Sequence, residues 1–156
     1  MTIATTLKIY LEQQSAVYEI ISHQRTQTSM DTATTAHIPV DQLAKAVIVK
    51  EEEVYLMVVV PSDYHVHLGR LHQHLEHEVG LATEEELIAL FPDCDSGAIP
   101  PVGMAYDIRT LVDTSLRQQD DIFFESGDHQ HLIKVTGEQF ALLFGDAESI
   151  NVAKHM

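Results

Sequence analysis

The middle of the chain contains two apolar runs, Ala44-Lys45-Ala46-Val47-Ile48-Val49-Lys50 and Val54-Tyr55-Leu56-Met57-Val58-Val59-Val60, on either side of the charged tip Glu51-Glu52-Glu53. Both runs are rich in β-branched residues with little polar alternation, which predicts strands that are buried on both faces. The short acidic tip predicts that they form a hairpin. Pro61 follows directly and ends the second strand. We therefore expect this hairpin at the centre of a sheet.

The segments around the hairpin predict both helices and strands. Before it, residues 5–14 predict an amphipathic helix, 17–21 a strand, 23–30 a loop and 31–37 a short helix capped near Ser29 or Asp31. After it, we expect a helix over 64–78 and a second helix that begins at the capping box Thr83–Glu86 and ends near Phe91-Pro92. Strands are expected over 109–113, 121–125 and 131–136, with a turn or short helix over 114–119. A last helix is expected over 136–144, because Thr136 and Gln139 have capping-box spacing. This pattern predicts a mixed α+β fold, with many strands in one sheet and helices packed against it.

Length and composition indicate one ordinary globular domain, spanning residues 1–156. The chain is 45% hydrophobic and 21% charged. Its one cysteine, Cys94, excludes an internal disulfide framework and fits a reducing compartment. No sequence signature activates this thiol, so we interpret it as structural or incidental. We find no signal peptide and no membrane-length apolar run, and we therefore expect a soluble, cytoplasmic protein.

The net charge of −15 restricts the partners that the protein can have. A field of this sign repels phosphate backbones, which disfavours broad nucleic-acid binding. Only nine basic residues are present: Lys8, Arg25, Lys45, Lys50, Arg70, Arg109, Arg117, Lys134 and Lys154. A polyanionic substrate would have to be held by a local cluster of these residues, by backbone donors, or with the help of a partner.

Three features carry most of the information about function. The loop Gly97-Ala98-Ile99-Pro100-Pro101-Val102-Gly103 has a nearly fixed shape, because its prolines restrict φ. Its remaining N–H groups could point at a ligand, although a rigid turn is the alternative. Lys45, at the start of an apolar strand, must extend to solvent, pair with an acid or face a cleft. The third feature is the polar turn Ser126-Gly127-Asp128-His129-Gln130.

In their order along the chain, Lys45 first, then the loop and then the turn, these features resemble the YbaK/ProX family of aminoacyl-tRNA deacylases, which is related to the editing domain of bacterial prolyl-tRNA synthetases. The resemblance also includes the polar segment His23-Gln24-Arg25-Thr26-Gln27-Thr28 and the strand Ile122-Phe123-Phe124-Glu125 before the turn. It covers most of the chain. It implies an α+β fold around a mixed, barrel-like sheet, and hydrolysis of the ester that links a wrong amino acid to tRNA.

The resemblance also implies the residues of the site. Lys45 matches the lysine of the family's editing pocket, Gly97 and Pro101 match its Gly-x-x-x-Pro loop, and Gly103 ends that stretch, so these four are the candidate catalytic residues. The implied substrate-binding residues are Arg25, Thr28, Ala98, Ile99, Ser126, Gly127 and His129. The chain departs from the family at Pro100, which stiffens the loop, and at Asp128, where a small residue is common.

The implied reaction needs no cofactor or metal. We expect direct attack by water, helped by a substrate hydroxyl, with backbone donors stabilising the oxyanion. The implied partners are the 3′ end of aminoacyl-tRNA and an aminoacyl-tRNA synthetase, but neither DNA nor a membrane. A pocket that selects by size discriminates weakly between small side chains, so the sequence does not identify the amino acid. The alternative is a non-catalytic ligand- or synthetase-binding module of the same fold.

Several histidines lie close together in one segment: His65, His67, His72, His74 and His77. Histidine-rich tracts can bind transition metals. On a helix, however, residues two positions apart point to different sides, so these side chains cannot form one compact ligand set. The spacing favours a solvated helix face.

Overall fold

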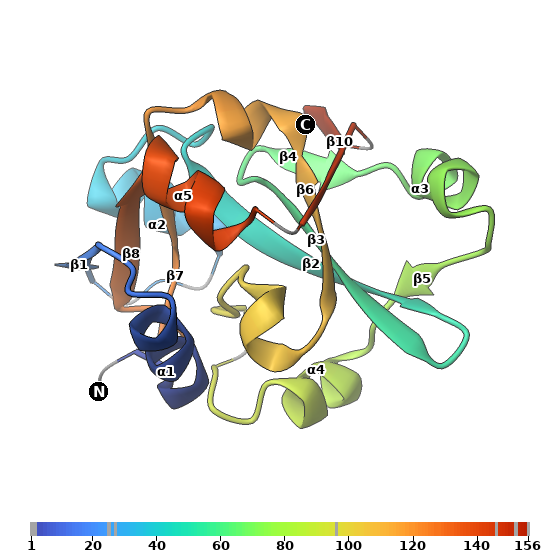
Figure 1. The fold of residues 1–156 in the computed structure, drawn as a ribbon, viewed down its shortest axis with the longest axis horizontal. Coiled ribbons are helices and arrows are strands. Elements are labelled where there is room, and N and C mark those ends of the chain that lie inside the picture. The colour runs from blue at the N-terminus through green and yellow to red at the C-terminus, as the bar shows by residue number, and fades with distance from the viewer. Residues whose placement is uncertain are drawn as a thin grey trace.

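The structure of the protein, a computed structural model, describes residues 3–24, 26, 28–95, 97–145, 147–151 and 153–155. The helices are α1 (Thr5–Gln13), α2 (Ser29–Ala36), α3 (Leu68–Leu75), α4 (Glu84–Leu90) and α5 (Gly137–Leu143), with the 3₁₀ helices η1 (Gly103–Tyr106) and η2 (Thr114–Gln118). The strands are β1 (Glu19–Ser22), β2 (Leu43–Glu51), β3 (Val54–Pro61), β4 (Tyr64–Val66), β5 (Gly80–Leu81), β6 (Arg109–Asp113), β7 (Asp121–Glu125), β8 (His131–Thr136), β9 (Glu148–Ile150) and β10 (Ala153–His155). Figure 1 shows their arrangement.

The main sheet has the strand order β1-β8-β7-β2-β3-β6-β9, and β5 pairs with the far part of β2. The sheet is mixed, because β2 pairs with β3 in antiparallel fashion but with β7 in parallel fashion, and β3 pairs with β6 in parallel. The order ends at β1 and β9, so the sheet stays open and does not close as a barrel. The fold is therefore the expected α+β class.

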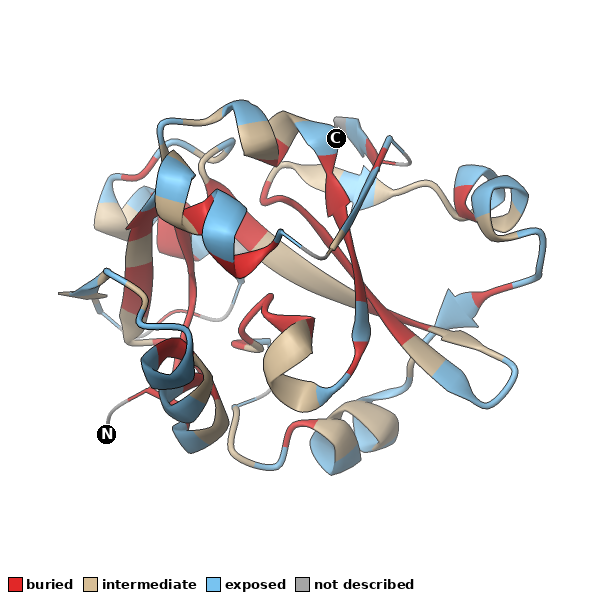
Figure 2. Cartoon of the chain, viewed as in Figure 1, coloured by how far each residue is buried: buried red, intermediate tan, exposed pale blue. Residues whose placement is uncertain are grey.

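The hairpin of β2 and β3 lies at the centre of this sheet, as its sequence predicts. Met57 and Val59 belong to the largest core cluster, whereas Val58 and Val60 belong to a second cluster on the other face. Successive side chains of a strand point to opposite faces, so β3 is buried on both sides. Figure 2 shows the buried residues concentrated along the central strands, with much of the helix surface exposed.

The expected helix over residues 64–78 is wrong in its first turn. Tyr64–Val66 form the strand β4, which pairs with β10 near the C-terminus. The helix α3 begins only at Leu68, where the His67 side chain accepts a hydrogen bond from the Arg70 N–H. The apolar spacing from Leu68 onward is helical, but a strand whose partner lies at the other end of the chain leaves little local signal.

Three other helices begin next to a residue whose side chain caps the first turn. Thr83 and Glu86 form the predicted capping box of α4, and Thr136 caps α5 by accepting from the Gln139 N–H. The cap of α2 was expected at Ser29 or Asp31 but is Thr28, whose hydroxyl oxygen accepts from the Asp31 N–H at 3.1 Å. Within the described parts of the chain, no helix combines the length and the apolar character needed to cross a membrane.

Candidate active site

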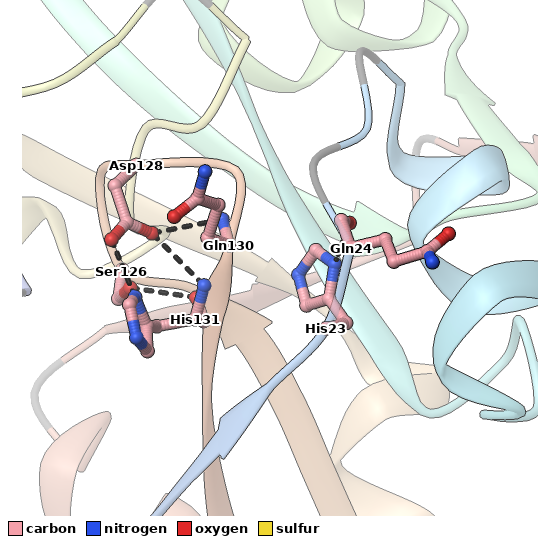
Figure 3. A network of polar contacts seen from close by, with 6 residues as sticks. All are labelled: His23, Gln24, Ser126, Asp128, Gln130 and His131. Carbon is pink, nitrogen blue, oxygen red and sulfur yellow. Dashed lines mark hydrogen bonds and ion pairs between the residues drawn. The ribbon is translucent and has the colours of Figure 1, made fainter. Parts of the chain in front are cut away.

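The turn that follows β7 is closed by its own side chains. Asp128 Oδ1 accepts hydrogen bonds from the N–H groups of Gln130 and His131, each at 2.9 Å. Its other oxygen lies 2.5 Å from His131 Nδ1, and Ser126 Oγ donates to the His131 carbonyl oxygen at 2.6 Å (Figure 3). Burial alone would raise the pKa of Asp128, but these hydrogen bonds lower it below its usual range. Asp128, a departure from the family pattern, therefore organises the turn.

The substrate-binding candidates in this turn are buried, and two of them have a positive φ. Ser126 is fully buried, and its carbonyl oxygen accepts from the Ala4 N–H at 2.7 Å. Gly127 has φ = 116°, and a Cβ there would lie 3.0 Å from Ala4 Cβ, so the position needs glycine. His129 is buried and adopts the left-handed conformation at φ = 61°. The fold thus holds the turn in one shape.

One end of the 97–103 loop is attached to this turn. The Asp95 N–H donates to the Gly127 carbonyl oxygen at 2.7 Å, and the Ala98 N–H donates back to the Asp95 carbonyl oxygen at 3.1 Å. Gly97 is exposed with φ = 81°. Two of the three features singled out in the sequence are therefore neighbours, and Gly97 is the loop residue that faces solvent beside the turn.

The other end of the loop enters the core. Pro101, Val102 and Gly103 are buried, and Val102 belongs to the largest core cluster. A Cβ on Gly103 would lie 2.1 Å from Thr110 Oγ1, closer than any real contact. Gly103 is therefore required by packing, whatever part it has in a reaction.

Lys45 is half-buried near the start of β2. Its ammonium group donates to the Ser62 carbonyl oxygen at 3.1 Å. Burial lowers the pKa of Lys45, while the nearby Asp63 acts in the opposite direction. Its strand neighbour Ala44 belongs to the core cluster that includes Val102, so alternation places Lys45 on the opposite face of β2. A pocket shared by Lys45 and the 97–103 loop stays a prediction.

A buried carboxylate that the sequence analysis missed lies beside this part of β2. Glu125 ends β7 and is 5% exposed. Thr32 Oγ1 of α2 lies 3.3 Å from Glu125 Oε1 and 2.5 Å from Thr26 Oγ1. Among the residues that the structure describes, Glu125 Oε2 has no hydrogen-bond partner. Burial raises the pKa of Glu125 to about 7, with a smaller contribution from the charge of Asp128 and partial opposition from the Thr32 hydroxyl.

The strand register places Glu125 next to Lys45. Ala44 of β2 pairs with Phe124 of β7 in parallel, so Lys45 and Glu125 are the next residues along the two strands. Both share the face of Leu43 and Phe123, which pack with Ala33 of α2. The sequence did contain one signal for this residue, an acid at the end of an apolar strand. Glutamate is seldom buried without a partner, so an acid in such a run is a candidate for a functional site.

The polar segment 23–28 contains two of the implied substrate-binding residues, Arg25 and Thr28, and also His23. Arg25 lies outside the described residues. Thr28 caps α2, so its hydroxyl oxygen already has a structural contact. His23 is attached to the turn, because its N–H donates to the Gln130 carbonyl oxygen at 2.9 Å, and its Nδ1 lies 2.6 Å from the Gln24 carbonyl oxygen (Figure 3).

The histidines of residues 65–77 contact separate partners. His72 Nε2 lies 3.0 Å from the Val79 carbonyl oxygen, and His74 Nε2 lies 3.3 Å from Glu148 Oε1. In the described ranges, no group of three or more His, Cys, Asp or Glu side chains is arranged to hold a metal ion.

Cys94 is half-buried, and burial raises its pKa to about 12, which is typical of an unreactive thiol.

Comparison with protein families identifies the class of this domain. The sequence model of the aminoacyl-tRNA editing domain matches residues 23–143, from the polar segment to the end of α5. The chain belongs to this aminoacyl-tRNA editing domain family, in agreement with its resemblance to YbaK/ProX proteins. No curated protein matches the sequence.

Solved structures share the fold at low sequence identity. A hypothetical protein superposes with a TM-score of 0.84 and 19% identity, over 96% of this chain and 99% of the other. A protein described as "a putative trans-editing enzyme for prolyl tRNA synthetase" superposes with a TM-score of 0.83 and 20% identity, over 96% of this chain and 95% of the other. At these identities the likeness concerns the fold.

Proposed function

We propose that the protein is a trans-editing hydrolase that cleaves the ester between a wrong amino acid and the 3′ end of tRNA. The observation that carries this proposal is the family match over residues 23–143, which includes Lys45, the 97–103 loop and the turn after β7. The likeness in fold to the structure described as "a putative trans-editing enzyme for prolyl tRNA synthetase" agrees with this class of reaction.

The loop offers a small set of donors for the oxyanion. Pro100 and Pro101 have no N–H, and the Ala98 N–H is bonded to the Asp95 carbonyl oxygen. Gly97, which is exposed, and Ile99, which is half-buried, are therefore the best candidates. A donor aimed at a developing oxyanion typically contributes about 2.7–4 kcal/mol to transition-state stabilisation.

Lys45 is suited to hold an anionic or carbonyl group of the substrate. Its bond to the Ser62 carbonyl oxygen uses one of the three N–H donors of the ammonium group and helps to fix its position. We assign it to the 3′-terminal phosphate or to the ester carbonyl oxygen. Because the lysine is half-buried in the sheet, its position is set before the substrate arrives.

A second candidate is a binding module that has kept the fold without the reaction. The observation that favours it is the structural use of several expected site residues. Thr28 caps a helix, Ser126 is fully buried, and Gly103 is packed against Thr110. Such a module would bind an aminoacylated 3′ end, or dock on a synthetase, and release no amino acid.

The two candidates are separated by deacylation assays on a panel of mischarged tRNAs. The hydrolase should release free amino acid from at least one of them faster than the uncatalysed reaction. Binding of an aminoacyl-tRNA without release from any member of the panel would support the binding module and overturn the hydrolase.

A further inference from the structure

Glu125 is a buried carboxylate with one oxygen that no described residue satisfies. It is 5% exposed, and Oε2 has no partner among the described residues. Its other oxygen depends on the Thr32 hydroxyl at 3.3 Å, but that hydroxyl also lies 3.0 Å from the Thr28 carbonyl oxygen. One proton is therefore shared between two acceptors. A buried carboxylate in this state costs stability, and such groups are enriched at functional sites.

The geometry around Glu125 orients one oxygen and leaves the other, which is buried, without a hydrogen-bond partner among the described residues. Thr26 and Thr32 form a short hydroxyl chain that ends at Oε1. Lys45 follows in the neighbouring strand, and Ser126 begins the turn to which the Gly97 loop is attached. Lys45 and the Thr26–Thr32 hydroxyl chain therefore adjoin this carboxylate on one face of the sheet.

We propose that Glu125 is the general base that activates the attacking water in this editing site. The proposal rests on the proposed hydrolase function. Glu125 Oε2 accepts a proton from water as the water oxygen bonds to the ester carbonyl carbon. When the resulting oxyanion collapses, the bond from carbon to the ribose oxygen breaks, and this oxygen takes the proton back from Glu125. The products are a free amino acid and a tRNA with a free hydroxyl.

The charges around Glu125 are compatible with this role. Burial raises the pKa of the Glu125 carboxyl to about 7, and the charge of Asp128 in the turn acts in the same direction. A base with a pKa near the working pH combines a useful ionised fraction with good proton affinity. Other charged or titratable groups on the surrounding elements include Lys45 on β2, Asp63 after β3, Asp31 on α2, His23, His129, and His131 and Lys134 on β8. None of these residues is changed in the variants compared below.

The test compares Glu125→Gln, Glu125→Asp and wild type on the best substrate of the tRNA panel. Glu125→Gln keeps the shape but cannot accept the proton, so the rate should fall about 100-fold or more. The wild-type rate, corrected for uncatalysed hydrolysis, should rise with pH and level off above about 7, whereas the Gln variant should lack this rise. Glu125→Asp should keep the rise at a reduced rate. Glu138→Gln, which removes an exposed glutamate on α5, is the matched control and should behave like wild type.

The affinity of the protein for a substrate analogue distinguishes a general base from a residue that only maintains the structure of the site. The probe is an aminoacyl-adenosine with an amide in place of the ester. Its Kd should change little in Glu125→Gln, because the proton transfer is absent from this complex. An unchanged rate and pH profile in the Gln variant would overturn the proposal, and so would a loss of rate matched by a loss of affinity. A wild-type protein that is inactive on every mischarged tRNA would instead overturn the hydrolase function, and this inference with it.

Discussion

The Asp95 N–H donates a 2.7 Å hydrogen bond to the Gly127 carbonyl oxygen and so joins the start of the Gly97 loop to the turn after β7. A second segment also contacts the turn, because the Ser126 carbonyl oxygen accepts from the Ala4 N–H at 2.7 Å. Backbone groups of three distant segments thus define one small region. Hydrogen bonds between main-chain groups thus fix the backbone there, which suits a site that stabilises an oxyanion by N–H groups.

Replacing Lys45 should reduce activity much more than stability. Lys45→Ala removes the proposed substrate contact but only one hydrogen bond, to the Ser62 carbonyl oxygen. Deacylation should fall by more than tenfold, while the Tm changes by a few degrees at most. Lys50→Ala on the same strand is the control, because Lys50 is paired with Glu86 at 2.9 Å and should be dispensable for the reaction. Equal losses of activity and stability in Lys45→Ala would mark this residue as structural.

Gly103 should be sensitive to the addition of a single methyl group. Gly103→Ala places a Cβ against Thr110 Oγ1 and the Ile108 carbonyl oxygen, and overpacking of this kind typically costs about 1–3 kcal/mol. Gly80→Ala is the control, since its Cβ would meet nothing within 4 Å. Urea unfolding of the two variants measures the difference. If both variants unfold at the wild-type midpoint, the close packing described for Gly103 is wrong.

The sequence predicts the central hairpin well because each strand carries its own signal. The bounds of β6, β7 and β8 also agree with the predicted ones, since compact apolar runs end at clear turns. The pairing of β4 with β10 was missed, because both are short and their contact depends on the whole intervening fold. Glu125 was missed for a similar reason. Its burial depends on Thr32 and on the register of β2 with β7, neither of which the residues around it reveal.

Binding of aminoacyl-tRNA should depend only weakly on salt. Three of the described cations are paired with acids: Lys50–Glu86 at 2.9 Å, Arg109–Glu148 at 3.0 Å and Lys134–Glu19 at 3.7 Å. Lys50 and Arg109 also lie toward the tip of the β2–β3 hairpin, away from Lys45. With about two or three phosphate contacts, log K should fall against log salt with a slope of about −1.4 to −2.1 on the single-stranded scale. Recognition would then centre on the 3′ end.

Binding and deacylation of two unrelated tRNAs that carry the same amino acid, at several salt concentrations, measure this. Similar values for both tRNAs are the expected result. A steep slope together with a strong preference for one tRNA body would show that the protein contacts much more of the tRNA than the acidic surface suggests.

Glu125 should make the stability of the protein depend on pH in a direction opposite to that of most carboxylates. Its pKa in the folded chain is raised to about 7, mainly by burial, so the folded chain holds a proton that the unfolded chain has already lost. Stability is therefore lost as the pH rises from the ordinary glutamate pKa to about 7, and the full penalty is on the order of 3 kcal/mol above that window. Glutamine has no such penalty, because it stays neutral.

Glu125→Gln should consequently be more stable than wild type at pH 8, and the difference should shrink toward pH 4. Urea unfolding at both pH values measures the two free energies. Glu138→Gln is again the control, since it removes the same charge from an exposed position that solvent screens. A Gln variant that is less stable than wild type at pH 8 would mean that the Glu125 carboxylate is stabilised by its surroundings, in which case the buried group described here does not carry an uncompensated charge.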